Sequence, residues 1–109
     1  MSAPSCVVFY GFEIDIADHD LGAFEAGSHE VQRAAKRLKL DLYWGNCASP
    51  AEHWVALAGI RIALIGPEAD PSASIATGEL LSVSREADGR LRELLPSLEP
   101  TLILRWFAD

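Results

Sequence analysis

The sequence predicts an α+β domain with a ferredoxin-like (split βαβ) fold, in which one antiparallel sheet carries two helices on a single face. Four segments of the 109-residue chain have the apolar patterns of strands, and two segments between them have helical spacing. Their order is strand, helix, strand, strand, helix, strand. A chain of this length forms one domain, which we expect to span residues 1–109.

The first strand and the first helix are expected in the N-terminal part of the chain. Residues 6–16 form an apolar run with acids only at its far end, which is typical of a strand buried on both faces. Residues 18–27 contain two glycines, so we expect a loop with one helical turn. Ser28 is the expected N-cap of a helix. Its apolar stripe follows helical spacing at Val31, Ala34, Ala35 and Leu38.

The middle of the chain predicts a pair of strands. Residues 40–47 alternate between apolar and polar side chains, as in a half-buried strand, and residues 46–50 have turn chemistry. The long apolar run at residues 53–65 is the expected central strand, with a bulge or bend at Gly59. An exposed loop is expected to follow at residues 66–78.

The last third predicts a short edge strand at residues 79–83, a second helix and a closing strand. We expect Ser84 to cap the helix and Pro96 to end it. The apolar stripe of this helix consists of Ala87, Leu91, Leu94 and Leu95. The closing strand at residues 101–107 alternates, so one of its faces carries Leu102, Leu104 and Trp106, and the other carries Ile103, Arg105 and Phe107.

The charge of the chain is strongly negative and unevenly distributed. Sixteen Asp and Glu residues against nine Lys and Arg residues give a formal net charge of −7. This balance repels nucleic acid and favours a protein partner with a basic surface. The expected partner-binding residues are the six acids that precede the first base, namely Glu13, Asp15, Asp18, Asp20, Glu25 and Glu30. The bases between Arg33 and Lys39 are expected to form a solvated helix end.

The cysteine content and the hydropathy pattern suggest the cellular location. Cys6 and Cys47 are too few for a disulfide framework, and they form no CxxC pair. The first residues lack a basic leader, and no apolar run reaches the length of a membrane span. We therefore expect a cytoplasmic protein with no membrane partner.

One acidic cluster provides an alternative function. Asp15, Asp18, His19 and Asp20 offer oxygen ligands to Mg²⁺ or Ca²⁺, so a small metal-assisted or acid–base enzyme is the alternative to an interaction module. The spacing does not fit an EF-hand, and a solvated acidic loop is the simpler interpretation.

Other catalytic patterns are weaker. Cys47 and His53 are a thiol and an imidazole close in sequence, but no third group orients them. The zinc, phosphate and dinucleotide motifs do not occur. We therefore assign no catalytic residue, no metal ligand and no cofactor.

The sheet face opposite the helices is a second candidate contact surface. The alternation of the strands places Tyr43, Arg105 and Phe107 on it. Aromatic residues on such a sheet stack bases in RRM domains, but the negative charge and the lack of an RNP-like string argue against that use here. A homodimeric ligand-binding domain that associates through this face is a further alternative.

Several segments together resemble small uncharacterised bacteriophage or prophage proteins. They are the opening strand with Tyr10, Gly11 and Phe12, the run YWGNCAS at residues 43–49 that leads into residues 53–57, and the aromatic end of the last strand. The resemblance implies an inhibitor or modulator of a host protein and brings no catalytic residues. It also implies that surface carboxylates imitate nucleic-acid phosphates and occupy a basic groove, as in some anti-CRISPR and anti-restriction proteins.

Overall fold

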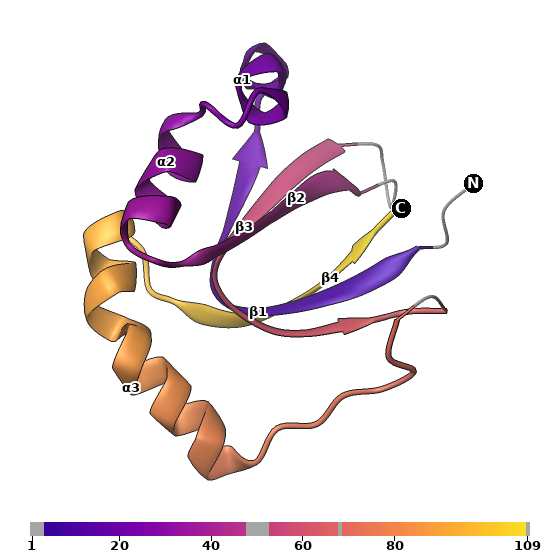
Figure 1. Ribbon diagram of the computed structural model, residues 1–109, viewed down its shortest axis with the longest axis vertical. Coiled ribbons are helices and arrows are strands. Elements are labelled where there is room, and N and C mark those ends of the chain that lie inside the picture. Colours follow the sequence, from indigo (N-terminus) through magenta and orange to yellow (C-terminus); the bar gives the residue numbers. More distant parts are fainter. Residues whose placement is uncertain (1–3, 48–52, 68, 109) are drawn as a thin grey trace.

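The computed structural model describes residues 4–47, 53–67 and 69–108, and it confirms the α+β class (Figure 1). Its four strands form one antiparallel sheet, with β1 at Ser5–Ile16, β2 at Asp41–Cys47, β3 at His53–Ile65 and β4 at Thr101–Phe107. The helical elements described are the 3₁₀ helix η1 (Asp18–Asp20) and the α-helices α1 (Leu21–Glu25), α2 (Glu30–Arg37) and α3 (Thr77–Leu94). None of these helices is both long and apolar enough to cross a lipid bilayer.

The strand order in the sheet is β2-β3-β1-β4, and every neighbouring pair is antiparallel. The central strands are therefore β1 and β3, and the edge strands are β2 and β4. The chain leaves β1 through η1, α1 and α2 before it enters β2, and it leaves β3 through α3 before it enters β4 (Figure 1).

The helices α2 and α3 pack on one face of the sheet. Phe12 of β1, Ala35 of α2 and Leu91 of α3 belong to one buried cluster on this face. Burial of a Leu or Phe side chain contributes roughly 1.5–3 kcal/mol, so the shared cluster holds both helices in place. The short helix α1 inserts Phe24 into a separate cluster at the far end of β1, together with Ile16.

The sheet bends where β1 crosses β3. Gly11 is the partner of Gly59, and a Cβ atom on either residue would collide with the backbone of the other strand. Gly59 also has a φ angle of +150°, which other residues rarely adopt. The bend expected at Gly59 is thus confirmed. The register irregularity lies elsewhere, between Val8 and Phe9.

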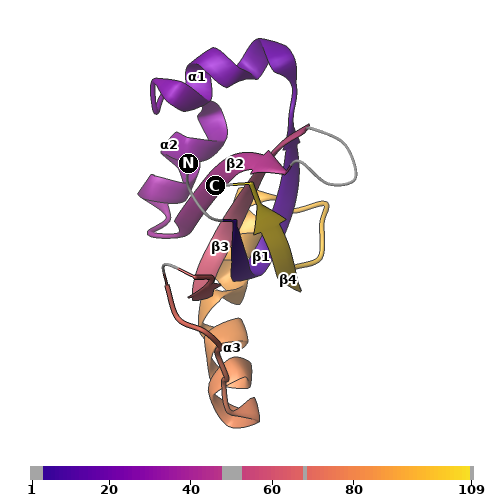
Figure 2. The ribbon, with the colours of Figure 1, turned by 90° about the vertical axis from the view of Figure 1, so that its right-hand side faces the viewer.

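The bend curls the sheet around a second core, on the face that carries no helix, which we call the inner face. This core cluster contains only strand residues, namely Val7, Phe9, Cys47, Val55, Leu57 and Phe107. The two edge strands meet at one end of it. The amide of Ala108 donates a hydrogen bond to the carbonyl oxygen of Asn46 at 2.8 Å. In Figure 2 the ends of β2 and β4 lie close together, so the sheet approaches a closed barrel there.

The expected boundaries of the second helix are wrong. Residues 79–83 are not an edge strand, because they belong to α3, which begins at Thr77 and not after Ser84. The helical spacing of the apolar stripe simply continues toward the N-terminus, through Leu80 and Val83 to Ala87.

The expected start of the first long helix is also wrong by one residue. His29, not Ser28, is the N-cap of α2. The segment at residues 18–27 is more helical than expected, because it forms η1 and α1. The expected turn at residues 46–50 starts within β2, and residues 48–50 lie outside the described residues.

Candidate functional site

The acids of the expected partner-binding face gather at one end of the molecule, where β1 ends and η1, α1 and the start of α2 follow (Figure 1). Two of the six lie on the last part of β1, two on η1, and one each on α1 and α2. Five of them are exposed, and Asp20 is half-buried. We use the name acidic end for five of these residues, Asp15, Asp18, Asp20, Glu25 and Glu30.

The charge of the acidic end is offset in part by Arg105, because the charge of Asp15 adds to the rise of that residue's pKa. Asp20 lies 3.6 Å from Nε2 of His19 and 3.7 Å from Nε2 of His29. Among the described residues, no carboxylate of the acidic end forms an ion pair with Lys or Arg. Glu13 differs, because its Oε1 lies 3.6 Å from Nε of Arg105 on the inner face.

His29 fixes the position of the acidic end. Its Nδ1 accepts a hydrogen bond from the amide of Val31 at 3.1 Å, and its own amide donates to Oε1 of Gln32 at 3.0 Å. Its ring stacks on Phe24 with the centroids 4.4 Å apart. Because Nδ1 accepts, neutral His29 carries its proton on Nε2, which faces Asp20. The capping box and the stacked ring therefore tie α1 to α2.

The residues considered for metal or acid–base chemistry do not form a metal site. Asp15 lies on β1, whereas Asp18, His19 and Asp20 lie on η1, and the side chain of His19 is 83% exposed. In the described part of the chain, no group of three or more His, Cys, Asp or Glu side chains could hold a metal ion.

A polar cluster lies on the inner face where the edge strands meet. Arg105 of β4 donates a hydrogen bond from Nε to Sγ of Cys47 on β2 at 3.3 Å. One of its Nη atoms lies 2.5 Å from Nε2 of His53 on β3. Glu13 of β1 provides the opposite charge. All four strands thus contribute to what we call the Arg105 cluster, Arg105 with Glu13, Cys47 and His53.

The chemistry of the Arg105 cluster follows from a guanidinium that stays protonated. The hydrogen bond to Cys47 raises the pKa of Arg105 above its ordinary value, burial opposes this rise, and Glu13 adds to it. A guanidinium has no acceptor, so His53 accepts through Nε2 and carries its proton on Nδ1.

Cys47 and His53 are direct partners across β2 and β3, so the structure does bring the thiol and the imidazole together. Cys47 is only 1% exposed, however, and its sulfur accepts the hydrogen bond from Arg105. This burial puts Sγ out of reach of a substrate. The arrangement therefore joins the strands of the curled sheet and does not form a nucleophilic site.

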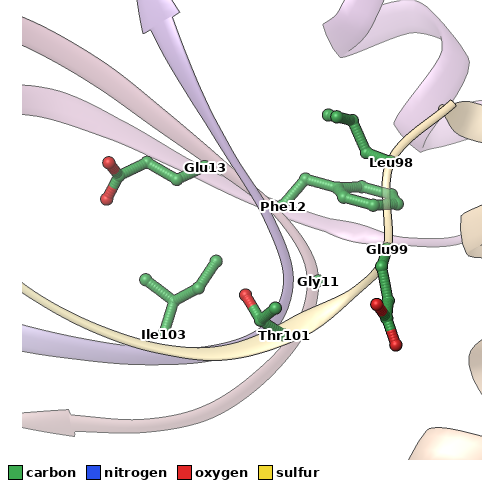
Figure 3. A pocket seen from close by; sticks show the side chains of 7 residues that line it. All are labelled: Gly11, Phe12, Glu13, Leu98, Glu99, Thr101 and Ile103. Atoms are coloured by element: carbon green, nitrogen blue, oxygen red, sulfur yellow. The ribbon is translucent and has the colours of Figure 1, made fainter.

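A groove of about 360 Å³ opens beside Glu13, between the bend of β1 and the segment that precedes β4 (Figure 3). Its lining consists of Gly11, Phe12, Glu13, Leu98, Glu99, Thr101 and Ile103. Figure 3 shows Glu13 and Glu99 at opposite ends of the lining, with their carboxylates directed away from each other and with Thr101 among the side chains between them. Such a lining suits a long side chain with an apolar stem and a cationic head.

The three residues expected as a sheet-face contact, Tyr43, Arg105 and Phe107, all contribute to the inner face. Phe107 is only 2% exposed, and the ring of Tyr43 meets it edge-on with the centroids 4.9 Å apart. The expectation that Phe107 offers its ring to a partner is therefore wrong, because the curled sheet encloses this residue.

The sequence did not reveal which face of β4 is exposed. Leu102, Leu104 and Trp106 are 45%, 63% and 59% exposed, although they are large and apolar. They lie on the face that carries the helices, and their exposure shows that the helices do not cover this part of it. In Figure 1 the first turns of α3 lie far from β4. The alternating pattern identifies both faces of a strand and does not say which one a helix covers.

No family model matches this sequence, and no curated protein or solved structure matches it either.

Proposed function

We propose that this protein is a small interaction module that uses its acidic end to bind a basic surface of another protein. The observation that carries the proposal is the set of exposed carboxylates at one end of the fold, with no Lys or Arg paired to them among the described residues. Charged groups of this kind steer association and make it depend on salt.

The groove beside Glu13 supports the same class of partner. Its apolar lining and the carboxylate of Glu99 suit an Arg or Lys side chain of a basic protein, whereas the carboxylate of Glu13 is already paired with Arg105. In this proposal the acidic end guides the encounter over a Debye length of about 8–10 Å, and the groove receives a cationic side chain on contact.

The biological setting that we propose is that of a phage-type inhibitor or modulator acting in the cytoplasm. The resemblance to small phage proteins supports it, as does the presence of two cysteines that form no disulfide. The basic surface of the host protein would be one that ordinarily binds nucleic acid, because exposed carboxylates can replace phosphates there.

We also propose that the chain follows the split βαβ plan of ferredoxin-like folds. The sheet order β2-β3-β1-β4 with antiparallel neighbours supports this plan, since β1 and β2 run in the same direction with β3 between them. The shared cluster of Ala35 in α2 and Leu91 in α3 supports the placement of both helices on one face.

The function is tested by charge neutralisation at the acidic end. The triple variant Asp15→Asn, Asp18→Asn and Asp20→Asn should capture an immobilised arginine-rich peptide about tenfold more slowly at low salt. The association rate is measured by biolayer interferometry at two salt concentrations. The difference between wild type and variant should shrink at high salt, because screening removes the steering.

A matched control carries the same change in net charge elsewhere. Asp70, Glu79 and Glu93 are exposed, lie outside the acidic end and have no ion pair in the described structure. Their replacement by Asn, Gln and Gln should slow capture far less. Equal association rates for the two triple variants would show that net charge alone acts and would reject the acidic end as a binding face.

A further inference from the structure

We propose that the free edge of β4 pairs with the β4 edge of a second copy of this chain. The two sheets would then join into one antiparallel sheet across a twofold axis that passes next to Leu104. This interface uses a surface apart from the acidic end, and its existence does not depend on the function proposed above.

The edge strand β4 lacks the features that keep edge strands unpaired. In the described structure β4 pairs as a strand only with β1, and its other side meets β2 only at the C-terminal end, where the amide of Ala108 donates to the carbonyl oxygen of Asn46, so the rest of that side presents unpaired backbone groups. Proteins commonly protect such an edge with charged side chains, proline or a bulge. The seven residues Thr101–Phe107 contain one charged residue, Arg105, whose guanidinium is turned to the inner face.

The exposed side chains of β4 form one continuous apolar stripe. Leu102, Leu104 and Trp106 lie on one face and together expose on the order of 300 Å² of apolar surface, the size of the largest apolar patch on a typical soluble monomer, which often serves as a contact site. The stripe borders a shallow groove of about 170 Å³ whose lining includes Ile62 and Ile75. This groove lies over β1 and β3, on the side of β4 away from its free edge, so a partner strand would meet the stripe alone.

A second copy fits this edge because the strand is self-complementary. In an antiparallel pair centred on Leu104, that residue faces its own symmetry mate, and Leu102 faces Trp106 of the other copy on either side. All three exposed apolar side chains of each copy then gain an apolar neighbour. No other antiparallel register of two β4 strands pairs all three of them.

Charge also favours a second copy at this edge. The chain has a net charge of −7, so contact between two copies is costly wherever acids face each other. The strand β4 contains no Asp or Glu, and the acidic end lies beyond the bend of β1 at Gly11. A basic partner, by contrast, would find no opposite charge on the exposed face of β4.

The size of the stripe sets the expected strength of the dimer. Stable interfaces bury about 800 Å² on each partner, and the stripe supplies less than half of that. We therefore expect a reversible dimer with a dissociation constant of about 10–100 µM. Sedimentation velocity of the full chain should show a sedimentation coefficient that rises with concentration from about 5 to about 500 µM.

The variant Leu104→Lys should keep the protein monomeric over the same range, because it sets two ammonium groups against each other at the twofold axis. Leu104 is 63% exposed, so the substitution should leave the far-UV circular dichroism unchanged. The matched control is Leu81→Lys, since Leu81 is 48% exposed but lies on α3. The control should dimerise like wild type, and a monomeric Leu81→Lys protein would contradict the β4 interface.

The register is tested by disulfide trapping with diamide as the oxidant. Leu104→Cys should form a covalent dimer, since facing residues of antiparallel strands have Cα atoms about 4.5–5.5 Å apart, within disulfide range. Leu102→Cys should not, because the two copies of residue 102 are separated by roughly 13 Å along the strands. The native cysteines Cys6 and Cys47 are buried and give little background.

Each result of these experiments decides for or against the proposal. A wild-type protein that is monomeric at every concentration overturns it. Equal trapping of Leu104→Cys and Leu102→Cys, or of neither, also overturns it, because the twofold register places only residue 104 next to its mate. A dimer that forms in wild type and in Leu104→Lys alike shows that a different surface associates.

Discussion

The guanidinium of Arg105 donates a hydrogen bond from Nε to Sγ of Cys47 at 3.3 Å, and so connects two strands at opposite edges of the sheet. The contact exists because the sheet bends at Gly11 and Gly59 and curls until β4 reaches β2. A flat sheet of four strands would hold its edge strands about 14 Å apart. The Arg105 cluster can therefore form only when the sheet is curled enough to bring β4 next to β2.

Arg105→Ala should lower the free energy of unfolding by about 1–3 kcal/mol. The substitution removes the donor to Cys47 and the contact to His53, and it leaves the carboxylate of Glu13 without its cation. Urea unfolding followed by circular dichroism measures the change. The control Arg85→Ala removes an exposed guanidinium from α3 and should change stability by less than about 0.5 kcal/mol. Equal losses in both variants would show that the Arg105 cluster does not hold the curled sheet closed.

Gly11→Ala should be among the most destabilising single-methyl additions in this chain. The new Cβ would meet the backbone oxygen of Ala58, and β1 and β3 would have to separate at their crossing. We expect a loss of about 3 kcal/mol or more, or failure to fold. Thermal unfolding of the purified variant, or its recovery in the soluble fraction, shows the effect.

Gly89→Ala is the opposite case. This glycine lies within α3 and is exposed, and a Cβ there would meet nothing within 4 Å. Alanine restricts the unfolded chain and favours the helix, so the variant should be about 0.5–1 kcal/mol more stable than wild type. A rise in the melting temperature checks it. A fall in the melting temperature would mean that a group outside this fold contacts the surface at Gly89.

His29→Ala should destabilise the protein by about 1–2 kcal/mol. The substitution removes the acceptor for the amide of Val31 and the ring that stacks on Phe24. It should also speed amide hydrogen exchange in η1 and α1, which depend on this contact. The comparison variant is His19→Ala, whose side chain is 83% exposed and which should behave like wild type. If both substitutions leave exchange in α1 unchanged, His29 does not hold the acidic end in place.

Phe107→Ala and Trp106→Ala should differ widely although the two residues are neighbours. Phe107 is 2% exposed in the inner core, and its truncation should cost about 3–5 kcal/mol. Trp106 is 59% exposed, and its truncation should cost less than about 1 kcal/mol in dilute protein. Chemical denaturation at low protein concentration separates the two. A reversal of the order would contradict the burial of the inner face.

The sequence predicted most of the fold because the strands carry strong local patterns. The apolar run of β3 and the alternation of β4 identify both elements with their boundaries. The first two turns of α3 are not predicted, although Leu80 and Val83 continue the helical spacing to Ala87, because this part of the helix packs little against the sheet, as the 48% exposure of Leu81 shows. Local patterns therefore succeed where burial is strong.

The candidate site was only partly predictable. The acids of the acidic end were identified from their order along the chain, and their exposure follows from the charge they carry. The Arg105 cluster was not, because it depends on a bend that brings the ends of β2 and β4 together. The one sequence signal for this bend is Gly59, which predicts that the strand bends but not toward which face of the sheet.

The inner core has a consequence for how the molecule comes apart. Since strand residues alone fill it, the loss of α3 would uncover the outer face and leave Phe9, Leu57 and Phe107 enclosed. Local opening of the helical layer should therefore precede global unfolding, and the amides of β1 and β3 near Phe9 and Leu57 should exchange only when the whole chain unfolds. The curled sheet would act as the most persistent cooperative unit of this protein.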